Sequence, residues 1–396
     1  MIWATQRLNQ LGYQSRGRSR HRPRDASHLY GGPYPFIQTG DVKHAGLYIS
    51  EYEQTYSEAG LEQSKLWPAG TLCITIAANI AETAILGMDA CFPDSVIGFI
   101  AEPSKADVRF MKYLFDATIQ RRVQQFTQGA TQDNLSQEKL LSIDFLVPDV
   151  DEQKEIADIL SAYDELIENN LRRMALLEEA ARLLYQEWFV RLRFPGHEHT
   201  PSHDGVPEGW EQRRFGDLCE EVKELVDPAD VEPDTPYIGL EHMPRRSITL
   251  SAWGEAEEVT STKHRYLEGD ILFGKIRPYF HKVGLALTSG VTSSDAIVMR
   301  PNSENLRSLV LMTASSDSFV ATTSQAVREG SKMPRADWKL MQQYPVLQPP
   351  HALLAAFGET ITCITSQLKT LAFQNQKLRA ARDLLMPKLM SGEISA

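Results

Sequence analysis

The sequence lacks the features that would place the protein in a membrane or outside the cell. It has no run of 18 apolar residues, the length that a membrane-spanning helix needs. Its first ten residues, MIWATQRLNQ, lack the apolar segment of a secretory signal. The four cysteines lie far apart and form no C-x-x-C pair, which argues against a disulfide framework or a cysteine zinc site. We therefore expect a reduced, cytoplasmic protein with no membrane partner.

Positive charge is also scarce, because 41 Lys and Arg residues face 52 Asp and Glu residues and the formal net charge is −11. Such a balance disfavours a general affinity for phosphate backbones. The charges are segregated, however: residues 1–24 contain six arginines and no acid, and residues 271–282 contain three cations and no acid. Basic segments of this kind are the places where an acidic chain is expected to contact nucleic acid.

An internal repeat organises the chain, which at 396 residues is longer than one hydrophobic core usually serves. Four landmarks recur at separations of 199 to 201 residues. The matched landmarks are Pro35-Phe36-Ile37 with Pro236-Tyr237-Ile238, Trp67–Leu72 with Tyr266–Ile271, Gly129 with Gly330, and Pro148 with Pro349. The repeat predicts two similar globular domains of short strands and helices, each followed by one long helix.

Both long helices carry an apolar seam whose members alternate at spacings of four and three residues, the heptad pattern of a coiled coil. The first seam is Ile156, Leu160, Tyr163, Ile167, Asn170, Met174, Leu177, Ala181, Leu184 and Trp188, and the second is Phe357, Ile361, Ile364, Leu368, Leu371, Asn375, Leu378, Arg382, Leu385 and Leu389. We expect the seams to pack on each other, with Asn170 and Asn375 favouring one register. The alternative is two unrelated amphipathic helices, each lying on its own domain, although such helices usually have a wider apolar face.

The domain boundaries follow from the repeat and from a linker rich in Pro, Gly and polar residues. The predicted segments are a first globular domain at 1–147, a first long helix at 148–194, a linker at 195–209, a second globular domain at 210–347, and a second long helix at 348–396.

Three partial matches to catalytic motifs are incomplete. Gly269–Lys275 fits the phosphate loop, but Ile276 stands where the magnesium-binding hydroxyl should be. Pro148–Lys154 imitates a nuclease pattern, yet its acids crowd into one helix start, where capping explains them better. Gln348–His351 lacks the Asn and the aromatic residue that hold a flipped base in adenine methyltransferases. We therefore expect no catalytic residue and no metal ligand in this chain.

Basic and aromatic residues alternate in one short segment, which makes it the best candidate for contact with DNA. The segment contains Lys275, Arg277, Tyr279, His281 and Lys282. Arginine can read guanine bidentately, so Arg277 is the candidate for base contact, whereas Lys275 and Lys282 are expected on phosphate. The alternative is an exposed turn whose charges serve solubility. Further DNA-binding candidates are Arg16, Arg18, Arg20, Arg22, Asn134, Lys332 and Arg335.

Several stretches together give the chain a family likeness over essentially its full length. They are Pro148–Leu160, Ala180–Phe189, Pro207–Glu211, Gly269–Tyr279 and Leu384–Ile394. With the repeat and the two long helices, these stretches resemble the DNA-specificity subunit of type I restriction-modification systems. The likeness has departures, because Trp210–Asp217 has no clear counterpart in the first half and Glu152-Gln153 corresponds to Leu353-Leu354.

The resemblance implies an α+β fold in which two target-recognition domains each read one part of a split, asymmetric DNA site. It implies that the two long helices form an antiparallel coiled coil that docks two adenine-methylating subunits carrying S-adenosylmethionine. ATP- and Mg²⁺-dependent motor-nuclease subunits would complete the complex, so the chain itself would need no cofactor and catalyse no reaction. The runner-up is a stand-alone or fused metal-dependent endonuclease with built-in specificity domains, but no length is left for its catalytic domain.

Overall fold

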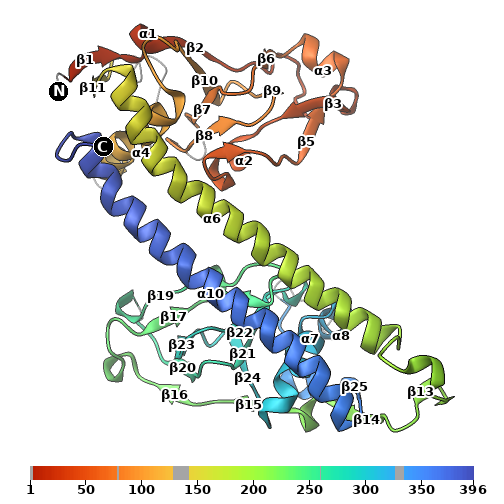
Figure 1. Ribbon diagram of the computed structural model, residues 1–396. Coiled ribbons are helices and arrows are strands. Elements are labelled where there is room, and N and C mark those ends of the chain that lie inside the picture. The colour runs from red at the N-terminus through yellow and green to blue at the C-terminus, as the bar shows by residue number, and fades with distance from the viewer. Residues whose placement is uncertain (1–2, 78–79, 128–141, 259, 326–333) are drawn as a thin grey trace. The chain divides into compact units, whose positions relative to one another are not determined.

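The computed structural model describes residues 3–77, 80–127, 142–258, 260–325 and 334–396. The chain forms two compact units, which are Met1–Asn169 with Asn375–Ala396 (unit 1) and Asn170–Gln374 (unit 2). Each unit therefore contains one globular part and one segment of each long helix (Figure 1). In the part of the chain that the structure describes, no helix combines the length and the apolar character needed to cross a membrane.

Unit 1 is built on two sheets and one strand pair. The five-stranded sheet has the order β2 (Gly12–Arg16), β10 (Val96–Ala101), β7 (Leu72–Thr75), β8 (Thr83–Leu86) and β4 (Tyr48–Ile49). The four-stranded sheet has the order β5 (Gln54–Tyr56), β3 (Tyr30–Phe36), β9 (Ala90–Cys91) and β6 (Leu66–Trp67), and the pair is β1 (Ala4–Arg7) with β11 (Asp144–Val147). The α-helices of its globular part are α1 (Leu8–Leu11), α2 (Thr39–His44), α3 (Glu58–Glu62) and α4 (Val108–Thr127).

Unit 2 repeats this plan. Its first sheet has the order β15 (Cys219–Val222), β24 (Ala296–Pro301), β21 (Ile271–Gly274), β22 (Val283–Ala286) and β18 (Thr249–Leu250). Its second sheet has the order β16 (Leu225–Val226), β20 (Lys263–Tyr266), β23 (Gly290–Thr292), β17 (Pro236–Ile238) and β19 (Gly254–Glu255), and the pair is β14 (Glu211–Arg214) with β25 (Pro345–Gln348). The α-helices of its globular part are α7 (Arg307–Ala314), α8 (Asp317–Gln325) and α9 (Trp338–Met341).

The matching strand orders confirm that the two globular parts share one fold. The five-stranded sheet of unit 1 and the first sheet of unit 2 have the same strand order. β10 and β24 lie second, β7 and β21 lie in the centre, and β4 and β18 are edge strands that pair in parallel. The pair β1 with β11 corresponds to the pair β14 with β25, since both join the start of a globular part to the strand before a long helix. The first half thus contains a counterpart of the strand that opens the second half, although the two sequences show no clear likeness there.

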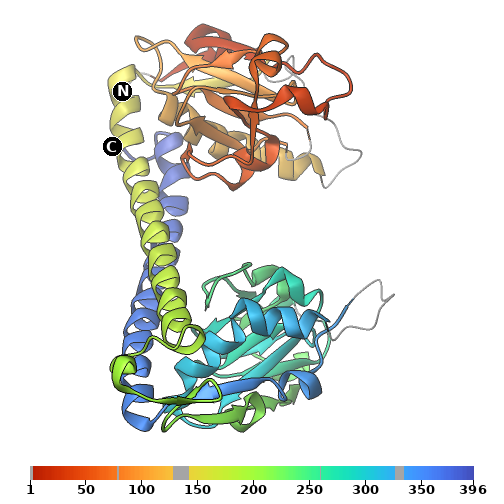
Figure 2. The same ribbon diagram turned by 90° about the vertical axis from the view of Figure 1, so that its right-hand side faces the viewer.

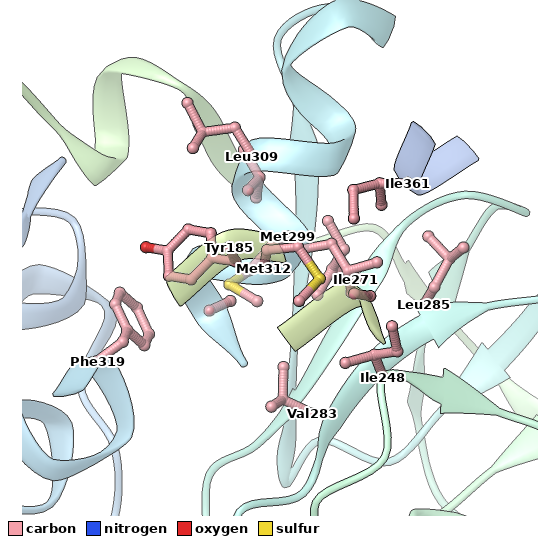
Figure 3. Close-up of a cluster of buried hydrophobic side chains, with 14 of the residues drawn as sticks. Tyr185, Ile248, Ile271, Val283, Leu285, Met299, Leu309, Met312, Phe319 and Ile361 are labelled. Atoms are coloured by element: carbon pink, nitrogen blue, oxygen red, sulfur yellow. The ribbon is translucent and has the colours of Figure 1, made fainter. Parts of the chain in front are cut away.

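Apolar side chains from both kinds of element fill the core of unit 2 (Figure 3). Ile271, Val283 and Met299 come from neighbouring strands of the first sheet and lie within one buried cluster with side chains of α7. Ile361 of the second long helix and Tyr185 of the first belong to the same cluster. Segments of both long helices are therefore part of this core.

The two long helices are α6 (Val150–Tyr185), which ends in a π-helical turn at Gln186–Val190, and α10 (His351–Met390). In unit 2, the Phe357 ring near the start of α10 packs against the rings of Trp188 and Phe189, at centroid distances of 5.8 and 4.7 Å. In unit 1, Arg382 near the end of α10 forms an ion pair with Asp164 in the first half of α6. Within each unit the two helix segments lie side by side and run in opposite directions (Figure 1 and Figure 2), which confirms the predicted antiparallel coiled coil.

The seam residues pack on the partner helix and also on the globular parts. Ile156 and Leu160 also join the core of unit 1, and Phe357, Ile361 and Leu368 also join the core of unit 2. Other seam members are only half-buried: Leu177, Leu184 and Trp188 pack at the margin of the unit 2 core, Leu385 packs at the margin of the unit 1 core, and Tyr163 and Leu378 belong to neither core. The helices thus combine the two arrangements that the sequence left as alternatives, because each packs on its partner helix and on a globular part.

A buried charge contributes to the pairing of the helices. Asp164 accepts a hydrogen bond from the Tyr113 hydroxyl at 2.6 Å and pairs with Arg382, so α4, α6 and α10 meet at one carboxylate. Burial raises the pKa of Tyr113, and the neighbouring Asp164 raises it further. The seam asparagines Asn170 and Asn375 are buried as well. Arg382, the charged member of the seam, is therefore paired with a carboxylate on the other long helix.

Candidate nucleic-acid interface

In each unit a basic segment leaves the same end of one sheet, which is the five-stranded sheet of unit 1 and the first sheet of unit 2. In unit 1, β2 and β7 both run antiparallel to β10, so Arg16 and Thr75 end beside the start of β10 at Ile97 and Val96. In unit 2, β15 and β21 have the same relation to β24. The segment that follows the first strand and the segment that follows the central strand therefore leave each sheet at one common end.

The two units place their cations in different segments at that end. In unit 1, the arginine-rich segment follows the edge strand β2, whereas residues 76–82 after β7 contain no Lys or Arg. In unit 2, the cations follow the central strand β21, whereas residues 223–227 after β15 contain two acids and one lysine. The two units thus present different basic side chains at equivalent positions of one fold.

The arginine-rich segment of unit 1 is held to the fold by its backbone and leaves its side chains exposed. The Gly17 N–H donates to the Val96 carbonyl at 2.9 Å, and the Arg18 N–H donates to the Phe92 carbonyl at 3.0 Å. Arg16, Arg18 and Arg20 are exposed, and none of them forms an ion pair with a carboxylate of the described residues. A fixed backbone with free guanidinium groups suits contact with a phosphate backbone.

The rest of this segment is partly engaged within unit 1. Arg24 pairs with Asp94 at 3.0 Å, just before β10. Arg22 donates to the carbonyls of Ser19 and His21 at 2.7 and 2.8 Å. Of the four arginines predicted here, Arg16, Arg18 and Arg20 are therefore the freer candidates for DNA contact.

The basic loop of unit 2, residues 275–282, joins β21 to β22 and is fixed by neighbouring segments. It contains a short 3-10 turn at Pro278–Phe280, flanked by Arg277 and His281 in the left-handed backbone region at φ 50° and φ 54°. The Arg277 N–H donates to the Pro334 carbonyl at 2.8 Å. Non-glycine residues occupy this region at a cost that the surrounding contacts must offset, and such residues often mark functional loops.

The segment that carries Arg335 lies directly beside this loop. The Ala336 N–H donates to the Lys275 carbonyl at 2.8 Å, and Ile276 and Arg335 form an antiparallel bridge. The exposed Arg335 side chain pairs with Asp295, the residue before β24, at 3.2 Å. The structure thus brings Arg335 beside Lys275 and Arg277, although Arg335 lies far from both in the sequence.

Two predicted DNA-binding residues of this loop are turned into the protein. His281 is only 6% exposed, and its Nε2 forms a hydrogen bond with the Ser315 carbonyl at 2.8 Å. Burial lowers the pKa of His281, which favours the neutral ring. Lys282 donates from Nζ to the Leu240 carbonyl at 2.6 Å, and burial followed by the nearby Arg245 lowers its pKa. Both side chains are thus engaged within the protein, where they hold the loop in place.

The remaining predictions have mixed outcomes in the structure. Arg277 and Tyr279 are exposed on the loop, and Lys275 is half-buried with Nζ donating to the Ser294 carbonyl at 3.1 Å. Asn134 and Lys332 lie outside the described residues. Burial alone therefore leaves Arg277 and Tyr279 as the accessible pair of the loop.

The structure adds a residue that the sequence did not single out. Arg245 lies in the turn before β18, and its guanidinium lies 4.2 Å from the centroid of the Phe280 ring. The only sequence signal was the adjacent pair Arg245-Arg246 in an otherwise acidic half. Because Arg245 is distant from Arg277 in the sequence, its position beside the basic loop could not be predicted from the sequence.

The segment Pro148–Lys154, which imitates a nuclease pattern, has a structural role. The Asp149 carboxylate accepts hydrogen bonds from the N–H groups of Asp151 and Glu152 at 3.1 and 3.0 Å, which makes it the cap of α6. Gln153 is buried and bonds to the Asp107 N–H and the Lys105 carbonyl, so it fastens α6 to unit 1. Across the described ranges, no group of three or more His, Cys, Asp or Glu side chains is arranged to hold a metal ion.

Two units of one fold, each with a fixed basic segment at the same sheet end and each completed by segments of two long helices, define a modular nucleic-acid-recognition protein. Residues 3–179 match the family model of the type I restriction modification DNA specificity domain. The resemblance inferred from the sequence is thereby confirmed: the chain is similar to the DNA-specificity subunits of type I restriction-modification systems, a class of subunit that is non-catalytic.

Two curated relatives and one solved structure illustrate this similarity. The type I restriction enzyme MjaIX specificity subunit of Methanocaldococcus jannaschii is 22% identical, over 92% of this chain and 88% of that protein. The EcoDI specificity subunit of Escherichia coli is also 22% identical, over 85% of this chain and 84% of that protein. The crystal structure of a type I restriction-modification S subunit from M. genitalium shares the fold, with a TM-score of 0.60 at 14% identity, 98% coverage of this chain and 96% coverage of that one.

Proposed function

We propose that the chain selects the DNA target of a type I restriction-modification complex in the cytoplasm, with each unit reading one part of a two-part site. The observation that carries this proposal is the shared sheet end, from which a basic segment emerges in both units. In unit 1 the contacts come from Arg16, Arg18 and Arg20, and in unit 2 they come from Arg277 and Tyr279 with Lys275 and Arg335 beside them. Lysine and arginine on phosphate would position the duplex, and arginine on base edges would specify its sequence.

The unequal placement of the cations supports an asymmetric site. If both units carried the same side chains at the sheet end, they would read the same bases and the site would be symmetric. Unit 1 offers arginines after an edge strand, and unit 2 offers a rigid loop with arginine and tyrosine after a central strand. Different side chains in equivalent positions favour different base sequences in the two parts of the site.

The partner subunits would supply the chemistry. We propose that two methyltransferase subunits bring S-adenosylmethionine, that motor-nuclease subunits bring ATP and Mg²⁺, and that this chain itself needs no cofactor. The candidate docking surface is a stripe on α6 and its π-helical turn, where Leu176, Leu183 and Val190 are exposed at intervals of seven residues. An apolar stripe at heptad spacing that its own fold leaves uncovered suits contact with a partner protein.

Reconstitution tests the proposal. The purified chain should neither methylate nor cut DNA, and adding a methyltransferase subunit with S-adenosylmethionine should produce adenine methylation at a two-part site. Sequencing the methylated DNA identifies both parts and their spacing. Robust metal-dependent cleavage by the chain alone would overturn the proposal and favour the endonuclease alternative.

Replacing Arg277 by alanine should relax specificity at one position in one part of the site. A bidentate contact between arginine and guanine discriminates by about 1–3 kcal/mol, and Arg277 has an exposed side chain on a fixed loop. The measurement is the methylation rate on duplexes that vary at each base pair. An equal loss of rate on all sequences would instead assign Arg277 to phosphate.

Replacing Leu183 by glutamate should weaken binding of the methyltransferase subunit and leave the fold intact. Leu183 is 48% exposed, so its replacement should change the free energy of unfolding by less than about 0.5 kcal/mol. The matched control is Leu340→Glu on α9, because Leu340 is 49% exposed in the same unit and lies outside the stripe. Co-purification of the two subunits is the readout, and equal binding by both variants would show that the stripe is not the docking surface.

A further inference from the structure

Arg245 differs from most arginines of unit 2 in having no acidic partner among the described residues. Its neighbour Arg246 pairs with Asp317 at 2.9 Å, and Arg300 pairs with Asp270 at 2.7 Å. Arg277 resembles Arg245 in this respect, and both side chains are exposed. In an acidic chain, two unpaired guanidinium groups at one place have their hydrogen-bond donors available for a ligand.

The two arginines share one aromatic ring. The guanidinium carbon of Arg245 lies 4.2 Å from the centroid of Phe280, and that of Arg277 lies 5.8 Å from the same centroid. Both distances are within the range of a cation–π interaction. Tyr279 packs edge-on against Phe280 at 4.9 Å, and its own ring is exposed. Two cations from separate loops of unit 2 therefore lie around the Phe280 ring.

The backbone around this ring is fixed from both sides. The Arg246 N–H donates to the His281 carbonyl at 2.8 Å, which ties the Arg245 turn to the basic loop. His281 in turn is bonded to Ser315, and Lys282 is bonded to Leu240. A long arginine side chain loses conformational entropy when it binds, and stacking on a held ring removes part of that loss in advance. The geometry is that of a preorganised recognition element.

We infer that Arg245 is a second specificity-determining residue of unit 2, reading guanine beside the base pair that Arg277 reads, with Phe280 as the positioning residue for both. Their distances to the Phe280 centroid place the two guanidinium carbons at most about 10 Å apart, which is within about three base-pair steps of about 3.4 Å each. The inference rests on the proposed function and extends it, because it predicts two guanine-containing positions close together in the part of the site that unit 2 reads.

The test uses the complete complex with its methyltransferase subunit and duplexes that carry every single base-pair change across the methylated site. The variants are R245A, R245K and F280L, and R213A on β14 is the control, because Arg213 is an exposed arginine of the same unit that pairs with Glu211. R245A should reduce discrimination at one base pair of one part of the site by about tenfold to a hundredfold. F280L should reduce discrimination less, at that pair and at the Arg277 pair together.

R245K separates base reading from phosphate binding. A single ammonium group can neutralise a phosphate but does not reproduce the planar, bidentate fork. R245K should therefore lose discrimination as R245A does, and R213A should retain it. If R245A weakens all sequences equally and R245K restores binding, Arg245 contacts phosphate and the inference is wrong. If a variant methylates too little to score, competition binding of the same duplexes gives the discrimination ratio, and an unchanged ratio also overturns the inference.

The result for the wild-type complex distinguishes failure of the proposed function from failure of the further inference. If the wild-type complex methylates no two-part site, the proposed function fails whatever Arg245 does. If the wild-type complex methylates such a site and the Arg245 variants leave its specificity unchanged, only the further inference fails.

Discussion

Replacing Asp164 by alanine is expected to destabilise unit 1 by about 3–5 kcal/mol, because it leaves the Tyr113 hydroxyl without its buried acceptor and leaves Arg382 with only the exposed Asp383 as an acidic partner among the described residues. The Asp164 side chain is 7% exposed and also accepts a hydrogen bond from Tyr113, so the substitution removes contacts to α10 and α4 at once. Urea denaturation, followed by hydrogen exchange in residues 150–169, measures the loss.

A second aspartate on the same helix is a matched control for this prediction. Asp158 pairs with Arg109 at 2.7 Å, but its side chain is 67% exposed, so Asp158→Ala should cost less than about 1 kcal/mol. The double variant Asp164→Leu with Arg382→Leu should recover much of the lost stability, since apolar residues can replace a buried ion pair. Equal effects of Asp164→Ala and Asp158→Ala would show that burial of the pair is unimportant.

Replacing Leu160 by aspartate is expected to have a similar or larger effect, about 5 kcal/mol or more. Leu160 is fully buried between α6 and the core of unit 1, where the variant loses apolar contacts and places a carboxylate without a partner. The expected result is a chain in which unit 1 is unfolded at ambient temperature. Circular dichroism and limited proteolysis of unit 1 report this directly.

Two other leucines of α6, Leu166 outside the seam and Leu177 within it, show how the cost depends on burial. Leu166→Asp should change stability by less than about 0.5 kcal/mol, because Leu166 is 51% exposed. Leu177→Asp should fall between the two, since Leu177 is a half-buried seam residue at the margin of the unit 2 core. If Leu160→Asp and Leu166→Asp proved equally mild, the placement of α6 against unit 1 would be contradicted.

The internal repeat and the long helices could be predicted from the sequence, because their signals are local or periodic. Alternating spacings of four and three residues identify an apolar helical face without knowledge of any contact. Landmarks such as Pro148 and Pro349 keep their separation because both halves have the same order of elements. The start of the first half was harder to match, since the pair β1 with β11 depends on strand pairing over more than 130 residues.

The candidate interface was only partly predictable, because exposure and contact depend on segments far along the chain. A run of basic and aromatic residues identified the loop at 275–282, but its alternation could not separate the exposed Arg277 from the buried His281. The partner of His281 is a carbonyl at residue 315, and the ring neighbour of Arg245 is at residue 280. Neither contact follows from sequence spacing.

The sequence by itself determined the two-unit plan, the helical seams, the basic segments and the family likeness, because composition and periodicity carry that information. Only the tertiary structure decided that the two basic segments leave equivalent sheets at the same end, although one follows β2 and the other follows β21. It also decided that Arg382 of the seam pairs with Asp164 and that Arg245 joins Arg277 around Phe280. The physical reason is that strand register and helix packing, which act between distant residues, fix where each side chain lies and which groups it can reach.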